Sequence, residues 1–435
     1  MVGSVNRNYL EKVMDLAETA EVLAIEDIFS AHKMKLISKG AKISRDVQEK
    51  LALHKLNKPL EASIAVQGGI DVGTVVSEAR QISERIEPVA RLLHVAGSGG
   101  GGCPFSVLSG AHFGSAMRTM LTIAERGGNT ASAHSVMVSL VSICLAKQIG
   151  LGENEQMCAA LAGLFHDIGE LYIDPMYLDK TRHLLPHEWR HIVVHPRVGQ
   201  LLIRQLDNFP PGVAQAVAEH HERFDGAGYP RQLSGKNISL VGQVVSVAEM
   251  VSGVLTDEDR PLERAELALK VVPGEHSGEL VSAISSTLRA TGASGRRNIE
   301  SIPAERAHDM VQRIDARIAS AIIETQKLLD GSELKTARAK DILLRSMNQI
   351  VIIRRAFRST GLYACIGANA KLLEANNTEI LFEAAVASKE FEWRLRDIAR
   401  YLALHADEID VRDKNALQHI IGVLDLGLEA MSAAA

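Results

Sequence analysis

The stretch that decides the fold is LFHDIGE, Leu164–Glu170, where a histidine and an aspartate stand side by side after an apolar run. A second stretch, HHERFDGAGYP at His220–Pro230, places two adjacent histidines before a glycine-rich turn. Packing alone is a poor explanation for both pairs, since charged and titratable side chains seldom fill a core. Imidazole binds borderline metals, and a carboxylate can bridge two cations, so the two stretches indicate a dinuclear metal site.

Five separate segments supply the expected ligands, which are His134, His166 with Asp167, His195, His220 with His221, and Glu249. In this prediction Asp167 bridges both ions, His134 and His166 hold one, and the other three histidines hold the second. Two cations about 3.5–4 Å apart acidify a shared water and stabilise an in-line displacement, so we expect phosphoester cleavage by a bridging hydroxide. Several histidines with carboxylates favour two divalent ions of iron or manganese.

These residues resemble the HD-GYP subgroup of the HD-domain phosphohydrolases. The motifs HDIG, HP and HHExxDGxGYP occur in the family's order at His166–Gly169, His195–Pro196 and His220–Pro230, within roughly residues 131–271. Most members are bacterial enzymes that hydrolyse cyclic di-GMP. The resemblance therefore implies a cyclic di-GMP phosphodiesterase that yields pGpG or GMP, with a helical HD-type catalytic core and the seven ligands named above.

The chain departs from the family's pattern near the expected metals. Glu170 stands where the family has a lysine, Glu249 replaces an aspartate, and Ser252 replaces a second acid. Thr130 stands where members with a third metal carry a glutamate, which implies two metals here. We expect Glu170 to act at the catalytic centre and to slow phosphoryl chemistry, since it adds negative charge where the transition state also gains it. The alternative is a degenerate member that binds nucleotide or partner proteins and signals without turnover.

The glycine-rich turn is the expected substrate site. Gly226 and Gly228 permit a positive φ and close approach of backbone amides to a ligand, and Pro230 stiffens the exit. Asp225 could equally cap a turn, and Tyr229 could equally be a packed aromatic rather than a base-stacking platform. The full predicted substrate-binding set is Arg223, Asp225, Gly226, Gly228, Tyr229, Pro230 and Arg260.

A competing motif lies at His187–His191, where HEWRH satisfies the H-E-x-x-H signature of zinc proteases. Adding His195 gives three histidines at four-residue spacing, which would share one face of a helix. The family resemblance makes only His195 a ligand. The glycine run at residues 97–102 lacks the Gly-Lys-Ser/Thr ending of a phosphate-binding loop and predicts a linker.

Length and composition restrict the classes of protein to which this chain can belong. The 435 residues suffice for two or three domains, and a net charge of −5 argues against a general nucleic-acid binder. The expected partner is thus a cyclic dinucleotide, with no DNA or RNA. The cysteines lack CxxC spacing, and no window approaches about 18 apolar residues, so we expect a cytoplasmic protein without membrane insertion. The cysteines are Cys103, Cys144, Cys158 and Cys365.

Periodicity predicts a mainly α chain in three parts. Residues 1–70 are expected to form a small α/β or β accessory module. Lys39-Gly40 lies at a predicted turn, which indicates a short β-hairpin or meander, and a helix opened by Ser44 follows. Residues 71–300 are expected to form the HD-type core. Residues 301–435 are expected to form a helical regulatory or dimerisation domain, because apolar residues recur at helical spacing, as in Met310, Ile314, Ile318 and Ile322.

Overall fold

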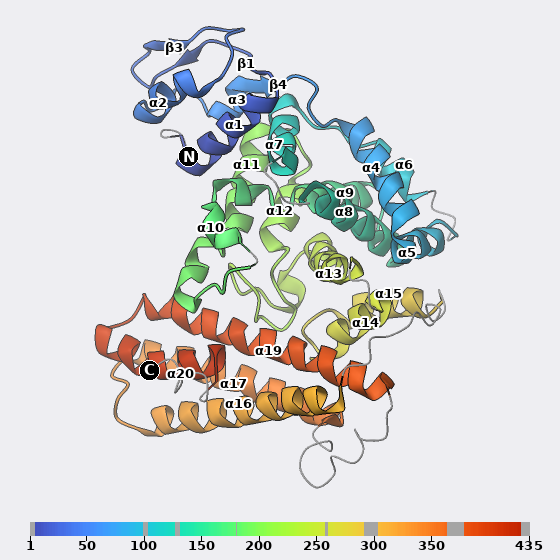
Figure 1. The fold of residues 1–435 in the computed structure, drawn as a ribbon, viewed down its shortest axis with the longest axis vertical. Coiled ribbons are helices and arrows are strands. Elements are labelled where there is room, and N and C mark those ends of the chain that lie inside the picture. Colours follow the sequence, from blue (N-terminus) through green and yellow to red (C-terminus); the bar gives the residue numbers. More distant parts are fainter. Residues whose placement is uncertain are drawn as a thin grey trace. The chain divides into compact units, whose positions relative to one another are not determined.

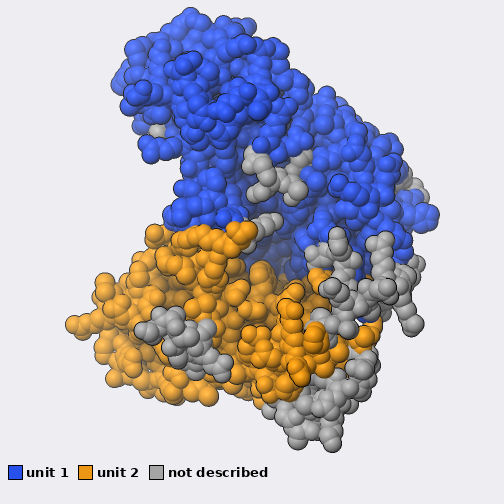
Figure 2. Space-filling view, viewed as in Figure 1, with its two compact units in different colours: residues 1–180, 191–262, 276–292 blue, residues 181–190, 263–275, 293–435 orange. Residues whose placement is uncertain are grey.

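The computed structural model describes residues 5–98, 103–126, 131–179, 181–256, 260–290, 303–362 and 378–427. These residues are mainly helical, with short strands confined to the N-terminal part (Figure 1), which confirms the predicted fold class. The chain divides into two compact units, coloured separately in Figure 2. Unit 1 comprises residues 1–180, 191–262 and 276–292, and unit 2 comprises residues 181–190, 263–275 and 293–435. The domain boundaries drawn from the sequence stay predictions. Thr130, Cys365 and residues 99–102 lie outside the described residues.

The N-terminal part of unit 1 combines small strands with helices. Its elements are α1 (Arg7–Thr19), β1 (Val22–Ala24), β2 (Ile28–Phe29), β3 (Lys35–Ile37), α2 (Arg45–Leu53), α3 (Leu60–Ser63) and β4 (Ile64–Val66). Strand β1 pairs with β4, and β2 pairs with β3, both antiparallel. We refer to residues 5–66 as the N-terminal module.

Strands β2 and β3 form a short hairpin, and the predicted turn at Lys39-Gly40 also forms, after β3 rather than within that hairpin. The connection between β2 and β3 is closed by hydrogen bonds from Ser30 N to Met34 O at 2.8 Å and from Lys33 N to Ser30 O at 2.9 Å. Lys33 takes a positive φ of 62° there, which the sequence did not signal by a glycine. Gly40, with φ of 80°, forms a later turn after β3.

Helix α2 begins directly after Ser44, which occupies the predicted N-cap position. The Ser44 hydroxyl makes no capping bond to the backbone and instead donates to the Asp46 carboxylate at 3.3 Å. The position of the helix start was thus correctly predicted, while the capping bond expected of such a serine is replaced by a side-chain contact.

Five helices pack on one another at the centre of unit 1: α8 (Ala131–Gln148), α9 (Glu153–Phe165), α11 (His195–Leu206), α12 (Pro211–Glu219) and α13 (Leu240–Leu255). Helices α8 and α9 approach closely at Gly163, because a Cβ there would lie 2.8 Å from the Ser139 Cα. Such a close crossing places the C-terminal end of α9, where HDIG begins, beside α8.

Other helices of unit 1 are α4 (Val72–Arg85), α5 (Glu87–Ser98), α6 (Pro104–Ser109), α7 (Ser115–Arg126), α10 (Pro175–Leu178) and α15 (Gly278–Ala290), with 3-10 turns η1 (Ile168–Tyr172) and η3 (Gly235–Asn237). The end of the N-terminal module and the segment after it contact α7 through hydrogen bonds from Val66 N to Thr119 Oγ1 at 3.2 Å and from Ile70 N to Thr122 Oγ1 at 2.9 Å. Both threonine hydroxyls thereby satisfy backbone groups next to β4.

Unit 2 is built around long helices, with its own apolar core. Its elements are η2 (Pro186–His191), α14 (Pro261–Lys270), α16 (Ala304–Asp330), α17 (Ala337–Ser359), α19 (Thr378–Ala406) and α20 (Val411–Asp425), of which η2 and α14 each extend by one or two residues into unit 1. Ile314 and Ile318 are buried in this core, as the helical spacing predicts. Among the helices described in either unit, none is long and apolar enough to cross a membrane.

Candidate metal centre

All seven predicted ligands lie on the five packed helices of unit 1 or directly at their ends. They are His134 on α8, His166 at the C-cap of α9 with Asp167 after it, His195 at the start of α11, His220 at the C-cap of α12 with His221 after it, and Glu249 on α13. Their ligand atoms form two groups that share Asp167, and within each group these atoms lie within 4.8 Å of one another.

The first group joins Asp167 to His134, His166 and Glu249. Glu249 Oε2 lies 2.9 Å from His134 Nε2 and 3.0 Å from His166 Nε2, while Asp167 Oδ2 lies 2.9 Å from His166 Nε2. The Glu249 carboxylate therefore reaches both histidines, although its side chain is longer than that of an aspartate.

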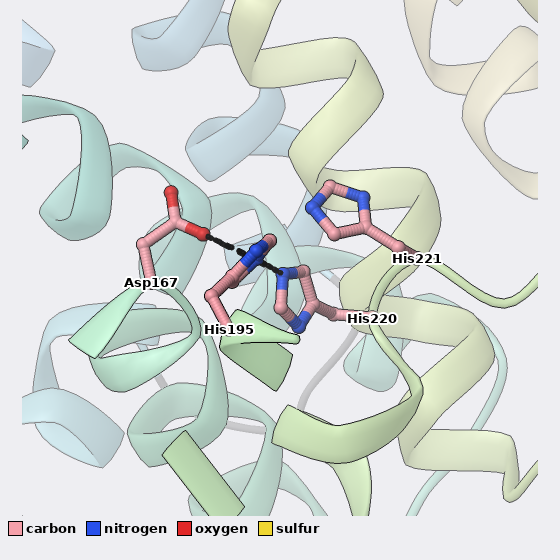
Figure 3. A group of neighbouring side chains, drawn as sticks. All are labelled: Asp167, His195, His220 and His221. Carbon is pink, nitrogen blue, oxygen red and sulfur yellow. Dashed lines mark hydrogen bonds and ion pairs between the residues drawn. The ribbon is translucent and has the colours of Figure 1, made fainter. Parts of the chain in front are cut away.

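The second group joins Asp167 to His195, His220 and His221. Asp167 Oδ1 lies 3.3 Å from His195 Nε2 and 3.5 Å from His220 Nε2. In Figure 3 the carboxylate points toward these two rings, and the His221 ring lies beside His220, with their ring centroids 4.1 Å apart. The two oxygens of Asp167 are thus divided between the two groups, as a bridging carboxylate requires.

Three of the histidines are held with Nε2 facing the centre. The Nδ1 atoms of His166, His195 and His220 lie 2.7–2.8 Å from the carbonyl oxygens of Gly163, Ile192 and Val217. A carbonyl only accepts, so Nδ1 carries the proton in each ring and Nε2 of the neutral ring presents a lone pair. Backbone contacts of this kind set the tautomer of histidines that bind metals.

The donor set fits a pair of divalent ions. His166 Nε2 is fully buried and has no hydrogen-bond partner of good geometry among the described residues, although two carboxylate oxygens lie within 3.0 Å of it. A cation bound to this nitrogen and to those oxygens would satisfy the buried nitrogen. One ion would be held by His134, His166, Asp167 and Glu249, and the other by Asp167 and the remaining three histidines.

The pKa values follow the uneven distribution of charge. Burial lowers the pKa of His166, but the carboxylates of Asp167 and Glu249 outweigh this effect and hold that pKa well above its usual range. Burial lowers the pKa of His221 well below its usual range, and the neighbouring His220 and His195 add to the shift. The two carboxylates therefore make the first group an attractive place for positive charge.

Glu170 lies on η1, three residues after Asp167, and is not a member of either group. Burial, followed by the nearby charge of Asp167, raises the pKa of Glu170 to about 7. The side chain thus adds a titratable carboxyl to an already acidic site. Ser252, on α13, is fully buried and also contributes to neither group.

The predicted substrate turn, residues 225–230, runs directly after the second group. Gly226 takes a φ of 83°, as predicted, and a Cβ on Gly228 would lie 2.4 Å from His221 O. Only glycine fits so close to the backbone of the histidine pair. Asp225 Oδ1 accepts a hydrogen bond from Ala227 N at 2.9 Å, which is the turn-capping contact considered from the sequence.

Tyr229 stacks on His221, with ring centroids 4.6 Å apart and planes inclined by 24°. One face of the tyrosine is therefore occupied by a predicted ligand, and the cis peptide to Pro230 follows. Arg223 precedes the turn along the chain, and its side chain is buried. Arg260 is half-buried before α14, has a φ of 47° and belongs to neither ligand group.

Two buried glutamates accept backbone hydrogen bonds from the segment that follows the turn, and neither is among the predicted site residues. Glu222 is buried and accepts hydrogen bonds from Arg231 N at 2.7 Å and Leu233 N at 2.8 Å. Glu219 is buried and accepts from Ser239 N at 2.9 Å, just before α13. Glu222 lies within HHExxDGxGYP, so the motif itself carried a signal, whereas nothing in the sequence marked Glu219.

The H-E-x-x-H segment does not form the helix that a zinc protease needs. Residues 186–191 form the 3-10 helix η2, and α11 begins separately at His195, so the three histidines do not share one helical face. His187 is exposed, and the His191 ring stacks on Tyr177 at 4.2 Å. Of these histidines, only His195 belongs to a ligand group.

Comparisons with known proteins bear on the same region. Residues 118–267 match the family model of the HD domain. The 3'3'-cGAMP-specific phosphodiesterase 3 of Vibrio cholerae is 30% identical over 134 residues, which are 31% of this chain and 28% of that protein. The cyclic di-GMP phosphodiesterase response regulator RpfG of Xanthomonas campestris is 35% identical over 149 residues, which are 34% of this chain and 39% of that protein.

The chain thus aligns with well under half the length of these relatives. A solved structure, Bd1817, a HDG"Y"P protein from Bdellovibrio bacteriovorus, aligns with 62% of this chain and 94% of its own, at 16% identity and a TM-score of 0.35. The matched residues 118–267 include all seven ligands. Over residues 118–267 the chain thus matches the HD domain, and about a third of the chain is distantly similar to proteins named as phosphodiesterases of cyclic di-GMP and cGAMP.

Proposed function

We propose that this chain is a metal-dependent phosphodiesterase that hydrolyses a cyclic dinucleotide. The observation that carries the proposal is the Asp167 carboxylate, whose Oδ2 faces His166 at 2.9 Å while its Oδ1 faces His195 at 3.3 Å. A pair of divalent ions, if held by these residues, would supply an activated water and neutralise charge on the phosphodiester. The activities for which the relatives are named support the same class of reaction.

The protein's own residues do the positioning. Backbone carbonyls accept from Nδ1 of His166, His195 and His220 and so orient the three rings. The Asp167 carboxylate contacts a histidine of each group. We propose that the turn with Gly226 and Gly228 receives the substrate, since its backbone runs directly beside His221. Arg223, Asp225, Tyr229, Pro230 and Arg260 complete the proposed substrate-binding set.

We propose cyclic di-GMP as the substrate, with iron or manganese as the metal because the ligands are imidazoles and carboxylates. The relatives include proteins named for cyclic di-GMP and for cGAMP, so both nucleotides belong in the assay. We further propose that residues 301–435 serve regulation or dimerisation.

Turnover by anaerobically purified protein with Mn²⁺ or Fe²⁺ tests the proposal, beside a His166→Ala/Asp167→Ala control. Linear dinucleotide or mononucleotide from the wild-type chain alone would support it, and preference between the two cyclic nucleotides would assign the substrate. If protein that holds metal binds either nucleotide but forms no product, the signalling alternative is supported. The observation that favours this alternative is the buried carboxyl of Glu170 next to Asp167.

A further inference from the structure

Helix α1 of the N-terminal module lies against η1, the turn that follows Asp167. The Lys12 ammonium donates to Glu170 O at 3.0 Å and to Ile173 O at 3.4 Å. Asn8 Nδ2 donates to Tyr172 O at 3.2 Å. The Glu170 carbonyl also accepts from Ile173 N at 3.1 Å, so the Lys12 ammonium adds a second donor to this carbonyl where η1 ends. A lysine can bind carbonyls at the end of a helical turn in this way.

A second contact from the module reaches the same turn. The Tyr9 and Tyr172 rings stack with centroids 5.3 Å apart and planes inclined by 12°. The Tyr172 hydroxyl donates to the Glu61 carboxylate of α3, and both Tyr9 and Glu61 are buried. The N-terminal module therefore contacts η1 through the Lys12 ammonium, the Glu61 carboxylate and the Tyr9 ring.

The position of η1 determines where the shared carboxylate lies. Glu170 N donates to Asp167 O at 2.8 Å, which closes the turn directly on the bridging residue. On its other side η1 has no room to move, because a Cβ on Gly169 would lie 2.1 Å from His195 O. Lys12 holds one side of η1 while α11, which carries His195, bounds the other.

We propose that Lys12 is a positioning residue for the metal centre, which holds η1 so that Asp167 faces both histidine groups. The N-terminal module is then a structural part of the catalytic site rather than an independent attachment. This inference rests on the proposed function, because it concerns the same bridging carboxylate. Groups that orient metal ligands typically change metal affinity by about 10–100-fold when they are removed.

The test compares Lys12→Met, Lys12→Arg and Lys50→Met in the full chain. Lys50 is a matched control, since its ammonium donates to Leu36 O at 2.8 Å within the module and does not contact η1. Mn²⁺ affinity is measured by calorimetry, the bound ion is observed by electron paramagnetic resonance, and the melting temperature of metal-free protein monitors folding. If Lys12→Met does not fold, Lys12→Gln replaces it, as a shorter side chain that cannot span both carbonyls.

We expect Lys12→Met to weaken Mn²⁺ binding by about tenfold and to alter the resonance spectrum, with recovery in Lys12→Arg, whose guanidinium can donate to both carbonyls. Lys50→Met should bind Mn²⁺ as the wild type does. Equal affinity in Lys12→Met and wild type, or an equal loss in Lys50→Met, would overturn the inference while leaving the proposed function intact. Wild-type protein that takes up neither Mn²⁺ nor Fe²⁺ would overturn both.

Discussion

His195 Nε2 lies 3.2 Å from His220 Nε2. Each ring already donates its Nδ1 proton to a backbone carbonyl, so two neutral rings would direct lone pairs at one another across this distance. A cation between or beside them, with Asp167 Oδ1 as a further ligand, removes that repulsion. The close approach of these two nitrogens is therefore consistent with a metal site.

Metal should stabilise the folded chain. At about 100 times its dissociation constant, Mn²⁺ should raise the free energy of unfolding by about 2.7 kcal/mol, because it binds the folded state alone. His195→Ala should reduce this gain, whereas His187→Ala should keep it, since His187 is exposed and outside both groups. Thermal melts with Mn²⁺ and with a chelator measure the effect, and a gain lost only in His187→Ala would favour the HEWRH segment as the site.

Gly169→Ala should damage the site by crowding. Its Cβ would lie 2.1 Å from His195 O and 2.9 Å from Gly199 N, both backbone atoms of α11. We expect a loss of roughly 1–3 kcal/mol in the free energy of unfolding, as overpacking usually produces, together with weaker metal binding.

The control for this substitution is Gly253→Ala on α13, where an added Cβ meets nothing within 4 Å. It should stabilise the chain by up to about 1 kcal/mol, as alanine does in a helix interior. Urea denaturation and Mn²⁺ titration compare the two variants. Unchanged stability and metal affinity in Gly169→Ala would contradict the close approach of η1 and α11.

Glu170→Lys should raise phosphodiesterase turnover by roughly tenfold, because it replaces a carboxyl beside Asp167 with a cation that can stabilise developing negative charge. Glu170→Gln keeps the size of the side chain and removes only its charge, so it should give part of the gain. Steady-state kinetics with each metal measure the effect. No gain from either variant with any metal would show that Glu170 does not restrain the reaction.

In unit 2, Arg394→Met should be strongly destabilising. Arg394 is buried on α19, where Nε donates to Glu275 Oε2 at 2.8 Å and Nη1 to Glu390 Oε2 at 2.8 Å. Removing one partner of a buried ion pair leaves an unpaired charge and costs about 3–5 kcal/mol. Arg396→Met, on the same helix but in an exposed pair with Glu392, should cost at most about 1 kcal/mol. Similar urea midpoints for both variants would contradict this assignment.

Much of the candidate site follows from short motifs, because adjacent residues such as His166 and Asp167 must lie together wherever the chain folds. Bringing His134 and Glu249 to them required the family's order of motifs, since spacing along the chain does not reveal which helices pack. Local signals were weaker for backbone conformation. Gly40 marked the turn after β3, whereas the connection between β2 and β3 uses a positive φ at Lys33 that no glycine signalled.

The supporting contacts could not be predicted from the sequence. Lys12 is more than 150 residues from Glu170 along the chain, and no periodicity or motif links an α1 lysine to two carbonyls of η1. Glu219 likewise resembles any helical glutamate until its carboxylate is seen to accept from Ser239. Such long-range polar contacts depend on tertiary packing, which cannot be predicted from local sequence patterns.

The most direct measurement is anomalous X-ray diffraction at the manganese edge from crystals grown with Mn²⁺. Two peaks should flank Asp167, about 3.5–4 Å apart, one beside His134, His166 and Glu249 and the other beside His195, His220 and His221. A single peak elsewhere, or no peak at Asp167 in crystals soaked to saturation, would contradict the two-metal centre.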